Sequence, residues 1–381
     1  MRPNPTLNFV AAESVNGVLA LESAGERFRV YWQSLAEHAA EPNSFYEPWA
    51  VIPSALQSSR PIRLIHAGRK DAATAILPIS IERNLGRWPI RHAAAWNHDH
   101  CFLSTPLVAQ GSERAAWRDL LAAADDSELP GFLSFPKLTL DGAVFDELQS
   151  LCAEQGRGIA ILQRHERAWL ASPDCAESYM ADRLSGKKRK ELRRLANRLG
   201  DEGTVTRDVW SSSEALEPWV EEYLALEAAG WKGRNASAIA DNARDVRAFR
   251  DTLTGAAAAG RLEMLRLAVD GRAIAILVNF RAEPGSFSYK IAYDESFSRY
   301  SPGVMIEIDN LARIASDPAI AWMDSCAAPD HPMIDHLWGE RRSIGHVVVA
   351  LRGPRRALAW SALLTLERLS ALARRKQDPA A

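Results

Sequence analysis

Residues 287–314 read as a strand, a polar loop and a helix, and this order constrains the fold more than any other part of the sequence. Aromatic and aliphatic residues alternate with small or polar ones over 287–293, which is the period of a half-buried strand. The helix is predicted to begin at Ser301, a good N-cap, with Pro302 at its first position. Gly303 lets a ligand approach the first turn, and the free N–H groups of a helix N-terminus favour an anion. The segment therefore predicts a strand-to-helix junction suited to a pyrophosphate.

The composition indicates a soluble globular protein and excludes several other classes. The chain has 381 residues, a length that predicts two domains. Its 47% hydrophobic and 25% charged residues are the usual balance for a soluble globular protein. Its net charge of -2 gives no argument for nucleic-acid binding. No apolar run is long enough to span a bilayer, and no signal peptide is apparent at the N-terminus. The four cysteines are far apart, which fits a reducing cytoplasm and no zinc site.

The predicted elements repeat coarsely along the chain. Each half reads as helices, a meander of antiparallel strands, a helix, a strand, another helix or loop, and a final strand. The clearest hairpin is the pair 262–269 and 273–280, which flanks the turn dipeptide Asp270-Gly271. The fold class predicted is mixed α/β (α+β), with one domain over residues 1–170 and a second over 171–381.

Three ionisable residues flank the junction that follows the strand. Lys290 is expected on the opposite strand face from Tyr289 and Tyr293, where it could reach a phosphate or a substrate carboxylate. Asp294 and Tyr300 stand at the two ends of the polar loop. The alternative interpretation is a solvated strand lysine and a loop aspartate that caps a turn.

The segment 324–338 is dense in groups that can move a proton. Asp324 ends a strand, and His331 stands between two prolines that stiffen its backbone. A histidine or carboxylate with a pKa near the working pH removes the proton from an amine efficiently. Asp330, Asp335 and the second histidine could also ligate a metal, but their spacing is no recognised zinc pattern. The alternative is that Asp330 caps a helix and both histidines lie on the surface.

Residues 183–198 carry eight basic side chains against one acidic, a net charge of +7. Leucines at helical spacing predict one basic helix with an apolar stripe. Such a helix could attract anionic lipid headgroups, a polyprenyl-phosphate-linked acceptor or nucleic acid. The absence of interleaved aromatic residues argues against specific nucleic-acid binding. The alternative is a solvated helix face.

Four segments carry a resemblance to a known family: KKRKELRRLANRLGDEG (187–203), LEAAGWKGRNASAI (226–239), YKIAYDESFSRYSPG (289–303) and MDSCAAPDHPMIDHLW (323–338). The chain resembles the CelD-type, cellulose-biosynthesis-associated GNAT proteins, which are related to the FemAB aminoacyltransferases. The resemblance implies tandem GNAT-like domains, each a mostly antiparallel twisted sheet flanked by helices. It also implies an acyltransferase that uses acetyl-coenzyme A, or another acyl-coenzyme A, and no metal. The acceptor would be a small-molecule or lipid-linked amine, such as an amino sugar of exopolysaccharide or envelope synthesis.

The resemblance assigns roles to residues of this chain. Ser301, Gly303 and Val304, with Lys290 nearby, would hold the coenzyme A pyrophosphate. His331 or Asp324 would be the base, and Tyr300 would protonate the leaving thiolate. Asp294 is a further candidate catalytic residue. Glu227, Trp231 and Lys232 would border the acceptor pocket, although Trp231 could equally cover the core edge and Lys232 lie in solvent.

Two other functions stay open from the sequence. One is a FemAB-like aminoacyltransferase that takes its donor from aminoacyl-tRNA. The other is a degenerate GNAT protein that serves as a scaffold or effector-binding module. A cytoplasmic protein that touches the membrane periphery through the basic helix 183–198 is expected, and an oligomer is left open.

Overall fold

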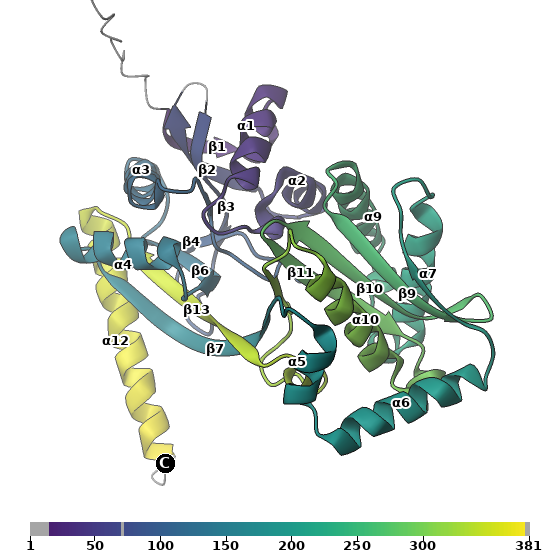
Figure 1. The fold of residues 1–381 in the computed structure, drawn as a ribbon. Coiled ribbons are helices and arrows are strands. Elements are labelled where there is room, and N and C mark those ends of the chain that lie inside the picture. Colours follow the sequence, from purple (N-terminus) through teal and green to yellow (C-terminus); the bar gives the residue numbers. More distant parts are fainter. Residues whose placement is uncertain (1–14, 70–71, 378–381) are drawn as a thin grey trace, which may run out of the picture.

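The computed structural model describes residues 15–69 and 72–377, and within them the centre of the molecule is one continuous thirteen-stranded sheet (Figure 1). The strand order is β1-β2-β3-β4-β6-β13-β7-β12-β11-β10-β9-β8, and β5 pairs with β3 outside this path. The strands are β1 (Gly17–Ala20), β2 (Arg63–Arg69), β3 (Ala72–Glu82), β4 (His92–Ala95), β5 (Leu107–Val108), β6 (Phe132–Thr139), β7 (Ile159–Ala171), β8 (Val205–Val209), β9 (Leu262–Val269), β10 (Arg272–Ala282), β11 (Gly285–Tyr293), β12 (Trp322–Asp324) and β13 (Glu340–Ala350).

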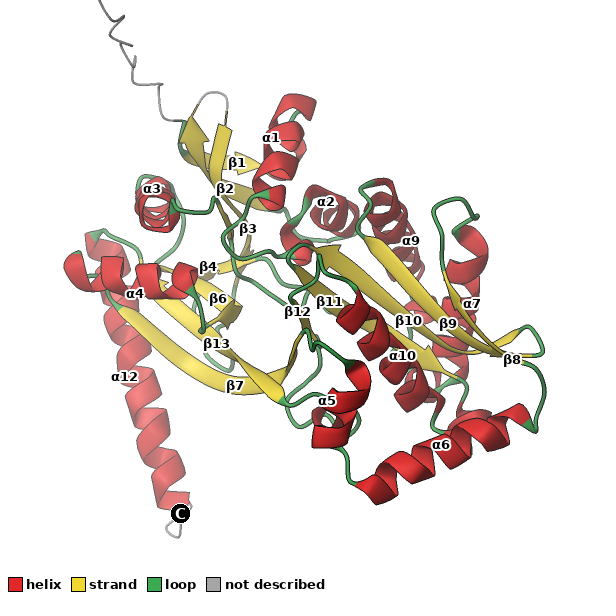
Figure 2. Ribbon diagram, viewed as in Figure 1, coloured by secondary structure: helices red, strands yellow, loops and turns green. Residues whose placement is uncertain are grey.

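Helices cover both faces of this sheet (Figure 2). Over β9 to β11, α10 packs on one face, whereas α7 and α9 pack on the other. The α-helices are α1 (Glu26–Glu37), α2 (Pro48–Leu56), α3 (Glu113–Asp125), α4 (Ala143–Glu154), α5 (Ala176–Arg183), α6 (Gly186–Gly200), α7 (Glu217–Ala229), α8 (Trp231–Arg234), α9 (Ala243–Ala258), α10 (Pro302–Ser316), α11 (Ile334–Leu337) and α12 (Pro354–Gln377). None of the helices in the described part of the chain is long and apolar enough to cross a membrane.

The predicted fold class is confirmed: the fold is mixed α/β, with a mostly antiparallel sheet flanked by helices. Among the described strands, the two parallel pairs are β4–β6 in the first half and β11–β12 in the second. The last strand, β13, lies between β6 and β7, so a strand of the second half completes the sheet of the first. One hydrophobic cluster also contains residues of both halves, such as Phe45 and Tyr289. The domain boundary at 170/171 stays a prediction.

Two local features of β9 to β11 follow from their residues. Asp270 and Gly271 both take positive φ, 49° and 79°, so the hairpin predicted at this dipeptide is confirmed. The β10–β11 ladder shifts register between Val278, which pairs with Lys290, and Asn279, which pairs with Ser288. Tyr289 is therefore the extra residue of a β-bulge, and the inside–outside alternation of β11 changes phase there.

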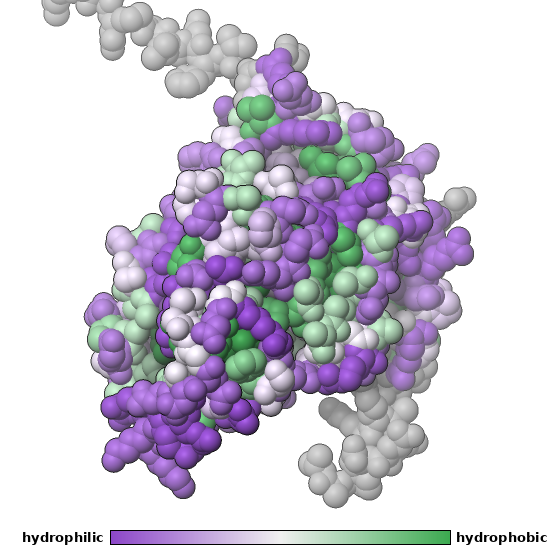
Figure 3. Space-filling view, turned by 90° about the vertical axis from the view of Figure 1, so that its right-hand side faces the viewer, coloured by the Kyte–Doolittle hydropathy of each residue, from purple (hydrophilic) through white to green (hydrophobic). Residues whose placement is uncertain are grey.

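The basic segment is not the single helix that the leucine spacing predicts. Leu184 has an extended backbone, and α6 begins afresh when the Ser185 hydroxyl accepts a hydrogen bond from the Lys188 N–H at 3.2 Å. Arg183 consequently ends α5, whereas the other basic residues of the segment lie on α6. Hydrophilic side chains gather at the lower edge of the face in Figure 3, at the height of α6 in Figure 1.

Candidate active site

The parallel strands β11 and β12 part after a short ladder. β12 pairs with β11 only at Gly285, Ser286 and Phe287, whereas β11 continues to Tyr293 beside β10. The second half of β11 therefore has no strand partner on its β12 side. An extended group of a ligand could lie along it there.

The bulge at Tyr289 decides which way Lys290 points. Ile291 and Tyr293 pack towards α10, whereas Tyr289 and Ala292 belong to the core cluster on the opposite face. The Lys290 ammonium lies 5.1 Å from the Tyr289 ring centroid and 5.7 Å from that of Phe102. The expectation that Lys290 faces away from Tyr289 is wrong, because strict alternation does not hold across a bulge. Lys290 and Tyr293 do lie on opposite faces.

Lys290 is a half-buried lysine without a carboxylate partner within ion-pair distance among the described residues. Burial, and next the nearby charge of Lys232, lower its pKa to about 8. Lys137, from β6, approaches the same Phe102 ring at 5.4 Å and donates to the Cys101 carbonyl at 2.6 Å. Lys137 of the first half and Lys290 of the second therefore both place their ammonium groups beside the Phe102 ring.

Glu227 and Lys232 form an ion pair beside Lys290. The Glu227 carboxylate accepts hydrogen bonds from Lys232 Nζ at 2.6 Å, the Ile239 N–H at 2.8 Å and the Tyr223 hydroxyl at 3.2 Å. Burial would raise the pKa of Glu227, but the charge and hydrogen bond of Lys232 and the hydrogen bond from the Ile239 N–H together lower it. Glu227, Lys232 and the half-exposed Trp231 line a surface hollow with residues 291–293 of β11. The cluster predicted as the acceptor site therefore does adjoin β11.

A loop of the first half completes this group of residues. His98 and His100 lie near Lys290, and burial, followed by lysine charges, lowers their pKa values to about 4 and about 3. Both imidazoles are therefore neutral at physiological pH. Nothing in the sequence links the two histidines to Lys290, because that proximity depends on the continuous sheet. We call Lys290, Glu227, Lys232, His98 and His100 the β11 cluster.

Helix α10 begins where the sequence predicts, with Ser301 at the N-cap position and Pro302 first, but the capping hydrogen bond is absent. Ser301 takes a left-handed conformation, φ 56° and ψ 53°, and its side chain makes no capping hydrogen bond. Its carbonyl accepts from the Val304 N–H at 3.0 Å, and Pro302 has no N–H. Gly303 therefore keeps the free amide of this first turn within the described structure. A Cβ on Gly303 would lie 3.3 Å from both Met333 and Tyr293, so these side chains flank the turn.

The hydrogen bonds of Tyr300 and Asp294 are made with residues outside the β11 cluster. The Tyr300 hydroxyl donates to Glu202 at the end of α6, and this hydrogen bond raises the tyrosine pKa. Asp294 accepts from the Ser296 N–H at 2.9 Å and pairs with Arg272, so it caps the turn after β11. The geometry thus favours the capping interpretation of Asp294 over a catalytic role.

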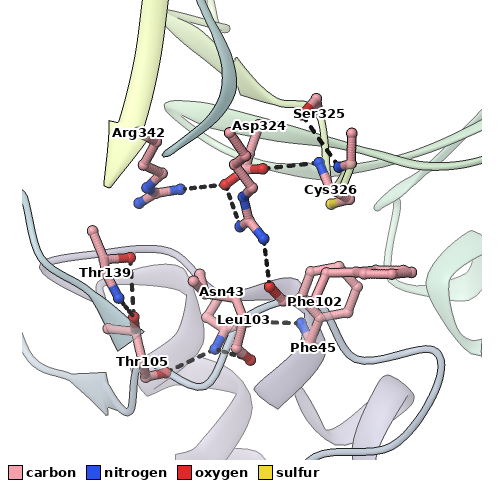
Figure 4. Close-up of polar contacts among 12 residues, drawn as sticks. Asn43, Phe45, Phe102, Leu103, Thr105, Thr139, Asp324, Ser325, Cys326 and Arg342 are labelled. Carbon is pink, nitrogen blue, oxygen red and sulfur yellow. Dashed lines mark hydrogen bonds and ion pairs between the residues drawn. The ribbon is translucent and has the colours of Figure 1, made fainter. Parts of the chain in front are cut away.

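Asp324 joins the two halves of the molecule (Figure 4). Its fully buried carboxylate accepts from Arg167 Nη2 at 2.6 Å, Arg342 Nη1 at 2.9 Å and the Cys326 N–H at 2.9 Å. Arg167 also donates to the Phe102 carbonyl at 2.7 Å. Burial would raise the pKa of Asp324, but the two guanidinium charges outweigh it and lower the pKa. This geometry favours a structural ion pair over a base.

His331 begins the short turn before α11. Its Nδ1 is within hydrogen-bond distance of the Met333 N–H at 3.4 Å and the Ile334 N–H at 3.3 Å. Burial lowers its pKa. The imidazole, rather than Asp330, thus caps this helix, while its Nε2 is left for other contacts. The side chain of Met333, two residues later, lies beside Gly303, so this turn adjoins the first turn of α10.

The residues at the α10 turn offer a coenzyme A pyrophosphate one free amide and the helix dipole. Lys290 does not join them, because it faces the other side of β11. No cluster of three or more His, Cys, Asp or Glu side chains within residues 15–69 and 72–377 could hold a metal ion.

Comparisons with known proteins place a GNAT acetyltransferase-like domain in the second half. Residues 186–331 match the family described as "Acetyltransferase (GNAT) domain". No curated protein matches the chain by sequence. The crystal structure of FemX is similar over 87% of this chain and 97% of its own, with 9% identity and a TM-score of 0.57. A conserved protein of unknown function from Bacteroides thetaiotaomicron is similar over 85% and 97%, with 13% identity and a TM-score of 0.55. Both likenesses concern the fold.

Proposed function

We propose that this chain transfers an acyl group, most simply acetyl, from acyl-coenzyme A to an amine. The GNAT acetyltransferase-like domain over residues 186–331 supports the reaction class. The position of Lys290 carries the proposal for the site: a lysine with a pKa near 8 stands beside the gap between β11 and β12. The thioester would lie along the unpaired part of β11, within reach of the β11 cluster.

The proposed chemistry is one acyl transfer with two proton transfers. Neutral Lys290 takes a proton from the acceptor ammonium, and the free amine attacks the thioester carbonyl. A C–N bond forms, the C–S bond breaks, and the second proton of the attacking nitrogen passes to the departing sulfur, so coenzyme A leaves as a thiol. A base with a pKa near the working pH is efficient in such a step. Lys290 fits this better than Asp324, whose carboxylate is held by two arginines.

For the acceptor, we propose an amine of exopolysaccharide or envelope synthesis, such as an amino sugar, in a CelD-type role. Glu227, Trp231 and Lys232 would border it, since they line the hollow beside β11. His98 and His100 would contact it as neutral hydrogen-bonding groups.

A second candidate is a FemAB-like transfer from aminoacyl-tRNA. Met333 and Tyr293 crowd the side of Gly303 on which a Cβ would stand, which would limit a pyrophosphate on that side and favours this candidate. The fold likeness to the FemX structure is compatible with it. This donor would bind with a steep dependence on salt.

Calorimetric titration separates these candidates. The acyl-coenzyme A proposal expects saturable binding of acetyl-coenzyme A that weakens in Gly303→Val, with Gly186→Val as the matched control at the start of α6. Saturable binding of aminoacyl-tRNA alone would support the second candidate. A folded protein that binds neither donor would contradict both transferase candidates, and the scaffold or effector-binding role would remain.

A further inference from the structure

A second hollow, of about 540 Å³, opens on the seam between the two halves. This volume is typical of sites for small organic ligands. Trp169 of β7 and Trp322 of β12 line it, together with Glu41, Asp141 and Arg342. We call it the tryptophan pocket.

The tryptophan pocket is separate from the β11 cluster. Trp322 pairs with Gly285 at the start of β11, five residues before Lys290, which corresponds to roughly 16 Å of strand. Aromatic side chains fill part of the space between them, with Phe45 5.4 Å from Phe287 and 6.0 Å from Tyr289, centroid to centroid. A ligand in this pocket is therefore not placed for acyl transfer beside Lys290.

The two tryptophans give the pocket an aromatic shelf. Their ring centroids are 6.2 Å apart, their planes differ by 26°, and both side chains are half-buried. Gly285 permits this arrangement, because a Cβ there would lie 2.1 Å from the Trp322 ring. The Arg342 guanidinium, 5.0 Å from the Trp322 centroid, holds one side of the shelf.

The carboxylates on the pocket wall have unused acceptor capacity. Glu41 accepts from the Val144 N–H at 3.0 Å through Oε1, but its Oε2 is buried with no hydrogen-bond partner in the described structure. Asp141 accepts from the Ser343 N–H at 2.6 Å through Oδ2, which leaves Oδ1. Burial raises the pKa of Glu41, against the smaller opposing effects of the Val144 N–H and the charge of Arg342. An ionised carboxylate can only accept hydrogen bonds, so Glu41 and Asp141 would pair with donors of a ligand. Arg341 and Arg342, which also line the pocket, would pair with its acceptors.

We propose that the tryptophan pocket binds a hexosamine ring. The C–H face of the sugar would lie on the tryptophan shelf, and its ammonium and hydroxyl groups would donate to Glu41 and Asp141. A nucleobase would also stack on tryptophan. A nucleobase, however, brings no ammonium group for Glu41 and Asp141. The hexosamine site does not depend on the proposed acyl transfer.

Saturation-transfer NMR on the full chain tests the site with glucosamine, N-acetylglucosamine and adenosine as probes. Glucosamine is expected to bind, and Trp169→Ala or Trp322→Ala to weaken it about tenfold through loss of the shelf. Trp88→Ala, in a turn of the first half, serves as the control for removal of a tryptophan and should leave binding unchanged. Circular dichroism verifies that each variant is folded.

Glu41→Gln tests the role of the carboxylate. It is expected to weaken glucosamine about tenfold, since a charge-assisted hydrogen bond is lost, and to change N-acetylglucosamine binding less. Absence of saturation transfer to either sugar would overturn the proposal. So would sugar binding that survives both tryptophan variants, or adenosine binding that exceeds that of glucosamine.

Discussion

At the scale of single residues, Lys290 makes the sharpest prediction about activity. With a pKa of about 8, it loses its proton as the pH rises through that value, so the turnover of a base-dependent transfer should rise there. Lys290→Met should lower the rate by about 10²- to 10⁴-fold and abolish this rise. Steady-state rates from pH 6 to pH 9.5 measure both effects, and an unchanged pH profile in the variant would exclude Lys290 as the base.

The same lysine also links pH to stability. Its pKa in the folded state lies below its unfolded value, so the unfolded chain binds more protons between about pH 8 and pH 10.4. The stability contributed by Lys290 is therefore lowest below pH 8 and recovers as the pH rises through this window. Lys290→Met should raise the melting temperature at pH 7 and lose this advantage by pH 10.4. A constant difference between the two melting curves would contradict the buried, charged lysine.

Loss of the Asp324 carboxylate is expected to destabilise the fold strongly. Asp324→Ala would leave Arg167 and Arg342, 3% and 10% exposed, without their shared partner. Breaking such a buried pair costs about 3–5 kcal/mol. Glu147→Ala is the matched control, because its ion pair with Arg114 is exposed and should contribute about 1 kcal/mol or less. Urea unfolding compares the two; equal losses would show that the Asp324 network is not a stabilising joint.

At the scale of elements, the β11–β12 junction depends on a glycine. Gly285→Ala would bring a Cβ within 2.1 Å of the rigid Trp322 ring, so the ring or the strand must shift. Overpacking of this kind costs about 1–3 kcal/mol. Gly186→Ala, at the start of α6, meets no atom within 4 Å and should be neutral or slightly stabilising. Chemical denaturation of both variants measures the contrast, and a neutral Gly285→Ala would refute the tight packing.

The elements themselves were largely predictable, whereas the orientations of key side chains were not. Asp270-Gly271 determines its hairpin locally, so the sequence predicts it correctly. The bulge at Tyr289 depends on how β10 and β11 pair, which period-2 alternation does not encode, so the alternation predicts the wrong orientation of Lys290 relative to Tyr289. Serine is a residue type favoured at N-caps, but Ser301 takes a left-handed conformation and its side chain makes no capping hydrogen bond. The partners of Asp324 come from β7 and β13, far away in the sequence.

At the scale of the whole molecule, the two halves share one sheet and one core. The path from β11 to β13 crosses back into the first half, and Asp324 holds β7 and β13 at that crossing. His98 and His100 reach Lys290 only because of this connection. The β11 cluster is thus a product of the full chain, which is why motifs of the second half alone did not identify it.

The exposed charge of α6 predicts contact with an anionic membrane. Lys187, Lys190 and Arg194 are exposed, whereas Leu195 and Leu199 anchor the helix in the core. Each basic residue near an anionic surface contributes about 1 kcal/mol, so neutralising all three to Gln should weaken binding to phosphatidylglycerol vesicles about 100-fold. Neutralising the exposed Arg83, Arg118 and Arg272 is the matched control for net charge. Co-sedimentation with the vesicles measures the binding of both triple variants. Equal losses would mean that net charge, rather than α6, governs binding. If the unmodified chain does not bind, α6 is a solvated face.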